Sequence, residues 1–455
     1  MKTYSMKTSG SKHLPLIALC LGFFMVIMDV TIVNIALPSM SKNLHGNISW
    51  LQWVVDGYTL TFACLLLSAG NLADRVGAKS TYLLGLILFT IASLACGLLS
   101  NFLMLTAMRL LQGIGAALLV PTSLALINAS YENKKERAYA MGIWSAIGGI
   151  AGAAGPVLGG FLVFYFGWRS VFFVNAPIGL IVFFMTKKFV VNPSPSGKGH
   201  FDVLGQLLGV ISIAALAFSL IEAGRMGFSS HLVVSSLVIF AVTFISFLIV
   251  EHKSTSPMFP LHFFRSQTFS VSIAIGMILS FAIYGEFFVL TLYFQHIRDY
   301  SVLITGFAFL PFLGTNALGS YLGGKLTSIS GAKLPMSIGL LIGAIGYFTL
   351  LIAKEHTPFI FLILPMIAIG FGLAFAIPAA TVATVHSAPE GRAGIASGAL
   401  NASRQIGSLM GVAIFGTIIM ISKNFIVGMH ETLIIGGLLY LVGCAAVLLW
   451  IKKEE

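Results

Sequence analysis

The sequence has very little charge. Asp, Glu, Lys and Arg make up 9% of its 455 residues, against about 25% in soluble globular proteins. Hydrophobic residues make up 57%, and there are 37 Phe and 48 Gly. So few charged side chains cannot cover a water-soluble fold of this size. The composition therefore excludes a cytosolic enzyme, a nucleic-acid-binding domain and a disordered chain, and it indicates a membrane protein with many spans.

The sequence also lacks the short motifs of common catalytic and nucleotide sites. It contains no Gly-x4-Gly-Lys-Ser/Thr phosphate loop, no His-Glu-x-x-His and no Gly-x-Ser-x-Gly segment. The ten histidines show no metal-ligand spacing. We therefore expect no direct use of ATP, no catalytic residues, no metal and no cofactor. All four cysteines (Cys20, Cys64, Cys96 and Cys444) fall in apolar stretches, which indicates buried free thiols and not a disulfide framework.

Long apolar runs dominate the chain instead. A helix that crosses a bilayer needs about 20 mostly apolar residues, and it satisfies its own backbone hydrogen bonds there. The first run holds Asp29 and Asn34 and has no small-x-small cleavage site, so we predict a span and not a signal peptide. The fourteen predicted spans are residues 14–38, 50–70, 80–100, 102–128, 138–166, 171–189, 203–222, 231–250, 268–292, 302–324, 334–353, 358–380, 394–420 and 432–451.

Basic residues are distributed unevenly between the two sides of these spans. With fourteen spans both termini share one side; 18 of the 26 Lys and Arg residues lie on that side and 6 on the other, while Arg109 and Arg404 lie inside spans. The positive-inside rule then places both termini in the cytoplasm, with the protein in the cytoplasmic (inner) membrane. The formal net charge of +11 is thus a topology signal, and we expect no nucleic-acid partner.

Two loops of the sequence repeat each other. Residues 70–79 read GNLADRVGAK and residues 324–333 read GKLTSISGAK, so five of ten positions match at an offset of 254 residues. Each follows the second span of a six-span set, which indicates two related halves around a central cavity. We therefore predict an all-α polytopic membrane protein. Its parts are an N-terminal six-helix bundle over 1–190, a linker with two inserted spans over 191–260 and a C-terminal six-helix bundle over 261–455.

Several segments resemble motifs of one transporter family. The loop over 70–79 is similar to the signature loop of the major facilitator superfamily, and others resemble that superfamily's fourteen-helix drug:proton antiporter family. These segments are 29–38 (DVTIVNIALP), 109–115 (RLLQGIG), 152–160 (GAAGPVLGG), 168–177 (WRSVFFVNAP) and 293–295 (YFQ). The resemblance covers the whole chain and implies the major facilitator fold. Ser328 and Ile329 replace Asp74 and Arg75 in the second copy of the loop, so a charge latch on that side would be one-sided.

Three charged residues inside spans are the candidates for proton coupling. An ionised carboxylate at the middle of a span costs roughly 2.5–3.5 kcal/mol, and burial favours the neutral acid, so Asp29 can take up and release a proton. Glu286 lies in span 9, the counterpart of span 1, and is a second protonation site or a cation anchor. Arg109 needs a partner, and the resemblance implies a part in proton transfer. The alternatives are a hydrogen-bonded structural Asp29 and a fixed ion pair or carbonyl clamp for Arg109.

Other polar and aromatic residues of the spans are candidates for substrate binding. Asp56 could attract a cation, with Trp53 and Tyr58 supplying aromatic faces; the alternative is a place in the interfacial aromatic belt. The role of Arg404 stays open between ligand contact and bonds to backbone carbonyls. The predicted substrate-binding residues are Asn34, Trp53, Asp56, Tyr58, Gln112, Glu286 and Arg404. Outside this set, Glu222 is predicted to be interfacial and Asp202 to cap span 7.

Glycine-rich segments are the candidates for gating. Between Gly148 and Gly159 glycines recur at spacings of four, three and four, which leaves one helix face without side chains. Pro156 can bend the same helix, and by resemblance this face is a rocking seam that favours antiport. An exposed Asp74–Arg75 pair would contribute only about 0–1 kcal/mol, so a latch there needs partial burial. The predicted gating residues are Gly70, Asp74, Arg75, Gly77, Gly152, Gly155, Pro156, Gly159 and Gly160.

Together these features predict a proton-coupled exporter, an antiporter of amphipathic, cationic drugs that works by alternating access as a monomer in the lipid bilayer. Its partners are then a small-molecule substrate and protons. The sequence leaves open a dedicated exporter of an endogenous metabolite such as a siderophore or a lipid. Proton-coupled uptake is disfavoured by the Gly155–Pro156 segment, and a membrane-embedded enzyme or receptor is disfavoured by the lack of catalytic constellations.

Overall fold

The computed structural model describes residues 13–131, 133–193, 202–254, 261–389 and 392–451. The regular elements in these ranges are helices. Thirteen are long and apolar enough to cross a membrane, or fourteen when the bent helix α2 is counted as one span, in agreement with the fourteen predicted spans. Residues 194–201 of the predicted linker, and the basic residues before 13 and after 451, lie outside the described residues.

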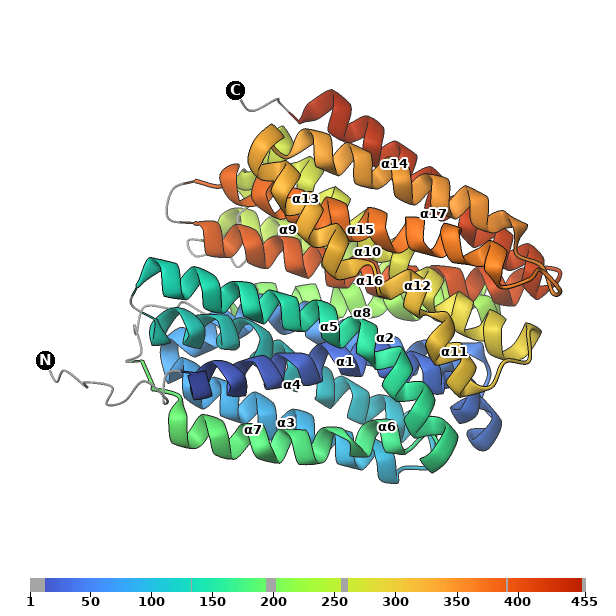
Figure 1. Cartoon of the computed structure of the whole chain (residues 1–455), viewed down its shortest axis with the longest axis horizontal. Coiled ribbons are helices and arrows are strands. Elements are labelled where there is room, and N and C mark those ends of the chain that lie inside the picture. Colours follow the sequence, from blue (N-terminus) through green and yellow to red (C-terminus); the bar gives the residue numbers. More distant parts are fainter. Residues whose placement is uncertain (1–12, 132, 194–201, 255–260, 390–391, 452–455) are drawn as a thin grey trace, which may run out of the picture.

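The first seven helices form an N-terminal bundle, which is blue to green in Figure 1. They are α1 (His13–Leu44), α2 (Ile48–Val76), α3 (Ala78–Leu98), α4 (Phe102–Ser130), α5 (Lys134–Phe166), α6 (Ser170–Phe173) and α7 (Asn175–Phe189). The inserted helices are α8 (Val203–Met226) and α9 (His231–Lys253).

The remaining helices form a C-terminal bundle, which is yellow to red in Figure 1 and lies alongside the first. They are η1 (Leu261–Arg265), α10 (Gln267–Leu292), the π-helical η2 (Tyr293–Ile297), α11 (Val302–Ala308), α12 (Leu310–Leu313), α13 (Asn316–Ser330), α14 (Lys333–Thr349), η3 (Leu350–Ile352), α15 (Ile360–His386), α16 (Ala393–Ile421) and α17 (Phe425–Trp450).

Polar side chains in the short loops fix where many helices begin. The side chains of Asn47, Asn101 and Asn424 accept backbone N–H groups at the starts of α2, α4 and α17. The Asp202 side chain accepts the N–H of Gly205 at 2.8 Å, so the predicted cap of α8 is confirmed. Such caps satisfy N–H groups that have no partner inside the helix. The four cysteines are free and buried, as their apolar surroundings predicted.

A single residue, Gly77, joins α2 to α3. Its φ of 99° lies in a region that glycine adopts at little cost because it has no Cβ. Just before it, α2 bends by 57° between Ile48–Leu66 and Ser68–Val76. The predicted gating loop over 70–79 is therefore the last two turns of α2, this one-residue turn and the start of α3, with Asp74 and Arg75 exposed to solvent.

Glycine contacts show that the two bundles repeat the same packing. A Cβ at Gly113 of α4 would meet the carbonyl O of Tyr58, and a Cβ at Gly370 of α15 would meet that of Phe312. In the same way Gly115 abuts Gly85 and Phe89 of α3, and Gly372 abuts Gly339 and Gly343 of α14. Corresponding positions on α4 and α15 are 257 residues apart in the sequence. Corresponding positions on the second and third helices of the two bundles are 254 residues apart.

The inserted pair α8–α9 is attached through α8, which packs against α2 of one bundle and α16 of the other. Gln206 donates to the carbonyl O of Cys64 at 2.8 Å, and Thr417 donates to the carbonyl O of Leu220 at 2.6 Å. Helix α9 packs on α8, and most of its apolar side chains are exposed. That distribution is typical of a helix that faces lipid, because a bilayer solvates apolar side chains.

The two bundles are held together at one end of the molecule. We call the end at which α1 begins and α17 ends the terminal end, and the opposite end the far end (Figure 1). At the far end Gln52 of α2 donates to the carbonyl O atoms of Val412 and Ala413 of α16, at 3.1 and 2.8 Å. There too, Gln295 donates to the carbonyl O of Ile35 at 3.0 Å. The structure is therefore closed at the far end.

Candidate functional site

An ion pair lies inside the N-terminal bundle, with no access to solvent. The Asp29 side chain on α1 is 0% exposed and that of Arg109 on α4 is 1% exposed. Arg109 Nη1 donates to Asp29 Oδ2 at 2.5 Å, which is the short distance expected of a charge-assisted bond. The two candidates that were placed separately in the sequence are thus direct partners.

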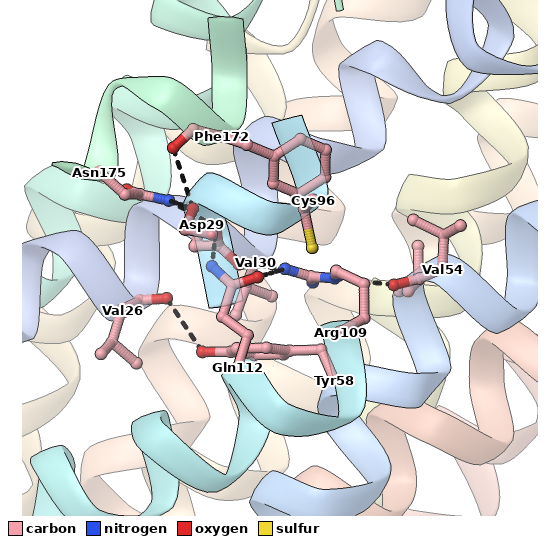
Figure 2. Close-up of polar contacts among 12 residues, drawn as sticks. Val26, Asp29, Val30, Val54, Tyr58, Cys96, Arg109, Gln112, Phe172 and Asn175 are labelled. Carbon is pink, nitrogen blue, oxygen red and sulfur yellow. Dashed lines mark hydrogen bonds and ion pairs between the residues drawn. The ribbon is translucent and has the colours of Figure 1, made fainter. Parts of the chain in front are cut away.

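Side chains from three further positions complete the site, as Figure 2 shows. Gln112, one turn beyond Arg109, accepts from Arg109 Nη1 at 2.7 Å and donates to Asp29 Oδ1 at 2.9 Å. Asn175 Nδ2, at the start of α7, donates to Asp29 Oδ1 at 2.8 Å and to Ser93 Oγ at 3.0 Å. Asp29 therefore accepts three hydrogen bonds, and the site links α1, α3, α4 and α7.

The remaining face of the guanidinium is also occupied. Arg109 Nε donates to the carbonyl O of Val54 on α2 at 2.9 Å. The Arg109 Cζ lies 4.4 Å from the centre of the Tyr58 ring and 5.9 Å from that of Phe172, so the cation also faces two aromatic rings. Tyr58 is thereby a wall of the ion-pair site (Figure 2).

This arrangement makes a proton and a guanidinium compete for one carboxylate. In the ionised form Asp29 holds Arg109, Gln112 and Asn175 together. Protonation removes the charge that holds Arg109, and it leaves a buried cation without its counterion, which is strongly unfavourable. A proton that reaches Asp29 would therefore loosen α1 from α4. The site is chemically suited to convert protonation into helix movement.

The residues around Asp56 do not gather into one aromatic site. Both carboxylate oxygens of Asp56 are buried and have no hydrogen-bond partner in the part of the chain that the structure describes. Trp53 instead turns to the inserted helix α8, where its indole N–H donates to Glu222 Oε1 at 3.1 Å. Glu222 is 7% exposed and also binds Arg225 at 2.8 Å. Trp53, Asp56 and Tyr58 thus point in three directions.

Asp56 lies on the face of α2 that meets α16 and α8. One turn before it, Gln52 binds the α16 backbone. One turn after it, Leu60 packs in a cluster with Ala217 of α8 and Leu409 of α16. Residues four apart on a helix share a face, so Asp56 lies at the boundary between the two bundles and the inserted helix.

Glu286 lies apart from this site, inside the C-terminal bundle. Its side chain on α10 is 0% exposed. Thr432 Oγ1 of α17 lies 3.4 Å from Glu286 Oε2, and Glu286 Oε1 has no partner. The structure therefore places Asp29 and Glu286 in different bundles, each in a first helix of its half.

Two other residues that were predicted to bind substrate have polar atoms without a hydrogen-bond partner among the described residues. Arg404 of α16 is half-buried with its Cγ close to Gly276 of α10, and its Nε has no hydrogen-bond partner. Asn34 of α1 donates to the carbonyl O of Val30 at 2.9 Å, while its own Oδ1 is unpartnered. Neither residue belongs to the ion-pair site.

The glycine-rich face of α5 packs closely on α1. A Cβ at Gly155 would collide with the Thr31 side chain, and one at Gly159 would lie 2.9 Å from Ile32 Cγ1. At Gly160 a Cβ would lie 2.9 Å from the carbonyl O of Val302, the first residue of α11 in the other bundle. The predicted seam thus serves two neighbours, one within its own bundle and one across the boundary.

An apolar recess of about 340 Å³ opens between α1 and α5 at the terminal end. Its lining is apolar apart from the imidazole of His13. The lining residues are His13, Leu16, Ile17, Cys20, Leu21, Phe24, Ile143 and Ile147. Such a surface suits the apolar part of an amphipathic molecule.

Comparison with known proteins gives the family. The family model described as Major Facilitator Superfamily matches residues 19–412 and, in a second match, 312–455. The chain belongs to the major facilitator superfamily. It is therefore an integral membrane transporter of small molecules and not an enzyme.

Relatives within the superfamily carry names that refer to drug resistance. The chain is 38% identical to the multidrug resistance protein Stp of Mycobacterium tuberculosis (strain ATCC 25618 / H37Rv) over 406 residues, 89% of this chain and 75% of the relative. It is 36% identical to the methylenomycin A resistance protein of Bacillus subtilis (strain 168) over 445 residues, 98% of this chain and 95% of the relative.

Solved major facilitator structures share the fold. A bacterial homologue of the human lysosomal transporter Spinster, in an inward-facing and unoccupied conformation, superposes with a TM-score of 0.67, covers 97% of both chains and is 18% identical. A transporter of the POT family superposes with a TM-score of 0.72 over 95% of both chains at 16% identity. The predicted major facilitator fold is confirmed.

Two members of the ion-pair site carried no prediction of their own. Asn175 and Ser93 are both 0% exposed, and they connect Asp29 to α7 and α3. Asn175 lies in the segment 168–177, whose resemblance to the family was noted, and a carboxamide in an otherwise apolar run was the available signal. Ser93 gave none, because small hydroxyl residues occur throughout the spans.

Proposed function

We propose that this major facilitator exports amphipathic, cationic drugs from the cytoplasm in exchange for protons. It does so as a monomer in the cytoplasmic membrane with both termini in the cytoplasm. The observation that carries this proposal is the buried ion pair between Asp29 and Arg109. A pair that a single proton can break, and that joins two helices of one bundle, is the device that proton-driven movement requires.

The side to which this conformation opens follows from the predicted topology and from the closed end. Eighteen of 26 basic residues fall on the side of the terminal end, so the terminal end faces the cytoplasm. The far end, where Gln52 holds α16, then faces outward and is shut. In this conformation a substrate enters from the cytoplasm and a proton that was carried inward has left Asp29.

The exchange cycle then has two protonation states of the N-terminal bundle. When the transporter opens outward, a proton binds Asp29 and releases Arg109. When it opens inward, the proton leaves and the pair re-forms with Gln112 and Asn175. The α5 seam at Gly155, Pro156 and Gly160 lets α5 move against α1 and α11 without bulky side chains in the way.

Substrate recognition is assigned to the boundary between the bundles. Asp56 is a buried carboxyl group without a partner at this boundary, so it is suited to hold the cationic group of a drug. The apolar recess between α1 and α5 lies apart from Asp56 at the terminal end, where it is suited to the first contact with the apolar part of a drug that enters from the cytoplasm. The names of the relatives, which refer to multidrug and methylenomycin A resistance, support antibiotics as the substrate class.

The test uses purified protein in liposomes with an imposed pH gradient. The wild type should move a fluorescent cationic drug against its gradient only while protons flow the other way. Asp29→Asn keeps the shape of the side chain but cannot bind and release a proton, so coupled transport should vanish. Coupled transport at the wild-type rate in Asp29→Asn would overturn the role of Asp29.

The matched control is Glu222→Gln, which changes a carboxyl group outside the ion-pair site. This substitution keeps an oxygen that can accept the Trp53 N–H, so coupled transport should persist. If neither the wild type nor the control responds to the pH gradient, the exporter is not driven by protons and the proposal fails as a whole.

A further inference from the structure

The C-terminal bundle contains a site that corresponds to the ion-pair site of the N-terminal bundle but has no cation. The packing of glycines fixes the correspondence between the two bundles helix by helix. Gly113 and Gly115 of α4 correspond to Gly370 and Gly372 of α15, because each pair makes the same backbone contacts with the second and third helices of its own bundle. Pro121 and Pro378 correspond at the same offset of 257 residues.

Three polar positions of the site recur in the second bundle. Glu286 corresponds to Asp29 and Thr432 to Asn175, both at an offset of 257 residues. Thr432 contacts Glu286 from α17, as Asn175 contacts Asp29 from α7. Tyr347 corresponds to Ser93 at 254 residues, the offset that the neighbouring glycines of α3 and α14 share.

The two positions on the fourth helix have changed their chemistry. The segment 109–115 reads RLLQGIG and its counterpart 366–372 reads MIAIGFG, so Met366 stands for Arg109 and Ile369 for Gln112. Both replacements are 0% exposed. Glu286 therefore lies in the pocket of the C-terminal bundle that corresponds to the pocket of Asp29. This pocket lacks the guanidinium and the carboxamide that stabilise the negative charge of Asp29.

The hydrogen bonds around Glu286 do little to stabilise a negative charge on its carboxyl group. Thr432 Oγ1 has one hydrogen, and it lies 2.8 Å from the carbonyl O of Met429 and 3.4 Å from Glu286 Oε2. A carbonyl oxygen cannot donate, so the Thr432 hydrogen goes to the shorter contact with Met429. Glu286 Oε2 therefore receives at most a weak hydrogen bond from Thr432, and its Oε1 receives none from the described residues.

Charged groups from the surrounding helices do not replace the missing cation. Tyr347 of α14 interacts electrostatically with Glu286, and its ring centre lies 5.3 Å from that of Tyr440 of α17. The hydroxyl oxygens of both tyrosines are without a hydrogen-bond partner among the described residues. His430 of α17 instead lies with its Nε2 2.8 Å from the carbonyl O of Ala353. On α16 the basic residue is Arg404, which packs at Gly276, ten residues before Glu286, or about 15 Å along the axis of α10.

The other described elements that pack against α10 bring no free cation to Glu286 either; η1 and η2 lie at the two ends of α10. Helix α1 brings Asp29, which Arg109 holds, and along α15 the only titratable residue is His386, its last residue. An ionised Glu286 would be a buried and uncompensated anion, which is far less favourable than the neutral acid.

We propose that Glu286, with Thr432, Tyr347 and Tyr440, forms a second proton-binding site that is occupied by a proton in this conformation, while Asp29 is ionised. The corresponding acids of the two bundles, Asp29 and Glu286, are thus in opposite charge states. When the C-terminal bundle exposes this site to water at the terminal end, the carboxylic acid releases H⁺ to that side and becomes a carboxylate. The inference rests on the proposed function for its role in transport, but the charge states themselves do not depend on it.

The test is infrared difference spectroscopy of the purified full chain at neutral pH, wild type minus variant. Glu286→Gln should remove the C=O stretching band of a protonated carboxylic acid. Asp29→Asn should instead remove the paired stretching bands of an ionised carboxylate. Glu286→Asp, which keeps an acid, should shift the acid band. Loss of carboxylate bands in Glu286→Gln would overturn the proposal.

A second measurement asks whether the proton on Glu286 is transported. In liposomes the number of protons exchanged per drug molecule should fall by one in Glu286→Gln relative to the wild type. An unchanged ratio would overturn the transport role of Glu286. If the spectra agree with the expected charge states but no variant or wild type exchanges protons, the proposed function fails and the second site stands. The spectra require no transport, so the two failures are distinguishable.

Discussion

The two buried carboxyl groups should respond very differently to the same chemical change. Replacing Asp29 by Asn and Glu286 by Gln each substitutes an amide for a carboxyl group at nearly constant volume. Asp29 accepts hydrogen bonds from Arg109, Gln112 and Asn175. Glu286 has one contact of 3.4 Å. The loss in unfolding free energy should therefore be larger for the substitution of an ionised, paired acid than for that of a neutral acid.

The magnitude at Asp29 follows from the geometry of its partners. Its Oδ1 faces two donors and its Oδ2 faces Arg109, so an Asn side chain can present its oxygen to only one of these sides. With the amide NH2 toward Arg109, the guanidinium loses its only anionic partner while it stays buried. Removing one partner of a buried pair costs about 3–5 kcal/mol.

At Glu286 no charge is lost, and the expected cost is that of one weak neutral hydrogen bond. Such a bond contributes about 0.5–1.5 kcal/mol. The measurement is the free energy of unfolding in mixed micelles, from denaturant titrations of each variant and of Asp29→Asn combined with Arg109→Gln. The double variant should be destabilised by clearly less than the sum of its single changes, because each single change leaves a lone buried charge and the double variant leaves none.

Equal costs at Asp29 and Glu286 would refute the assignment of different charge states. Additive costs for Asp29→Asn and Arg109→Gln would refute the ion pair itself. If the wild type shows no defined baseline for unfolding in one micelle composition, the comparison is repeated in another composition. This is sufficient because the test uses only the differences in unfolding free energy between variants.

Three further changes test the packing between helices. Gly155→Val should collide with α1 and abolish transport with a lower folded yield, whereas Gly149→Ala, whose Cβ would meet nothing within 4 Å, should retain both; similar behaviour of the two would count against the seam. Gln52→Leu removes two hydrogen bonds across the far end, so distances between spin labels there should shift toward those of the open form. A loss of about 1.4 kcal/mol from the closed form raises the population ratio of open to closed form roughly tenfold. An unchanged distance distribution would contradict this. Trp53→Phe should destabilise the fold by about 1–3 kcal/mol through the lost bond to the Glu222 carboxylate, and Glu222→Gln should cost less; the reverse order in thermal unfolding would argue against that contact.

The architecture was accessible from the sequence because it depends on simple physical limits. A bilayer of fixed thickness demands about 20 apolar residues per helix, so the spans could be counted, and thirteen helices with the bent α2 agree with that count. The cap at Asp202 was accessible for a similar reason, since an acid directly before an apolar run has few other roles. The domain boundaries, the orientation of the termini and the roles of individual site residues stay predictions.

The site was only partly accessible, because helix rotation decides where each side chain points. Trp53 and Tyr58 are close in the sequence, yet five residues at 100° each place them about 140° apart around the helix. One therefore faces α8 and the other faces Arg109. Asp29 and Arg109 were both identified, but their pairing depends on how α1 packs against α4, which the sequence pattern does not contain.

Small polar residues were the least predictable part of the site. Most hydroxyl side chains in the spans bind the carbonyl of their own preceding turn, as Thr59 and Thr384 do. Such residues show no difference in sequence from Ser93, which receives the Asn175 amide. The sequence around Thr432 does not distinguish it either, and its correspondence to Asn175 follows only from the glycine contacts that align the two bundles.

The ion pair has a consequence for how the membrane voltage acts on the protein. Asp29 and Arg109 carry opposite unit charges 2.5 Å apart, so a bundle that moves with the pair intact carries no net charge from this site through the electric field. Protonation of Asp29 leaves the charge of Arg109 uncovered, and each elementary charge that crosses 100 mV changes the energy by about 2.3 kcal/mol. In the proposed cycle the voltage therefore acts through this site only when Asp29 carries a proton, and the movement with an ionised Asp29 involves no electrical work at this site.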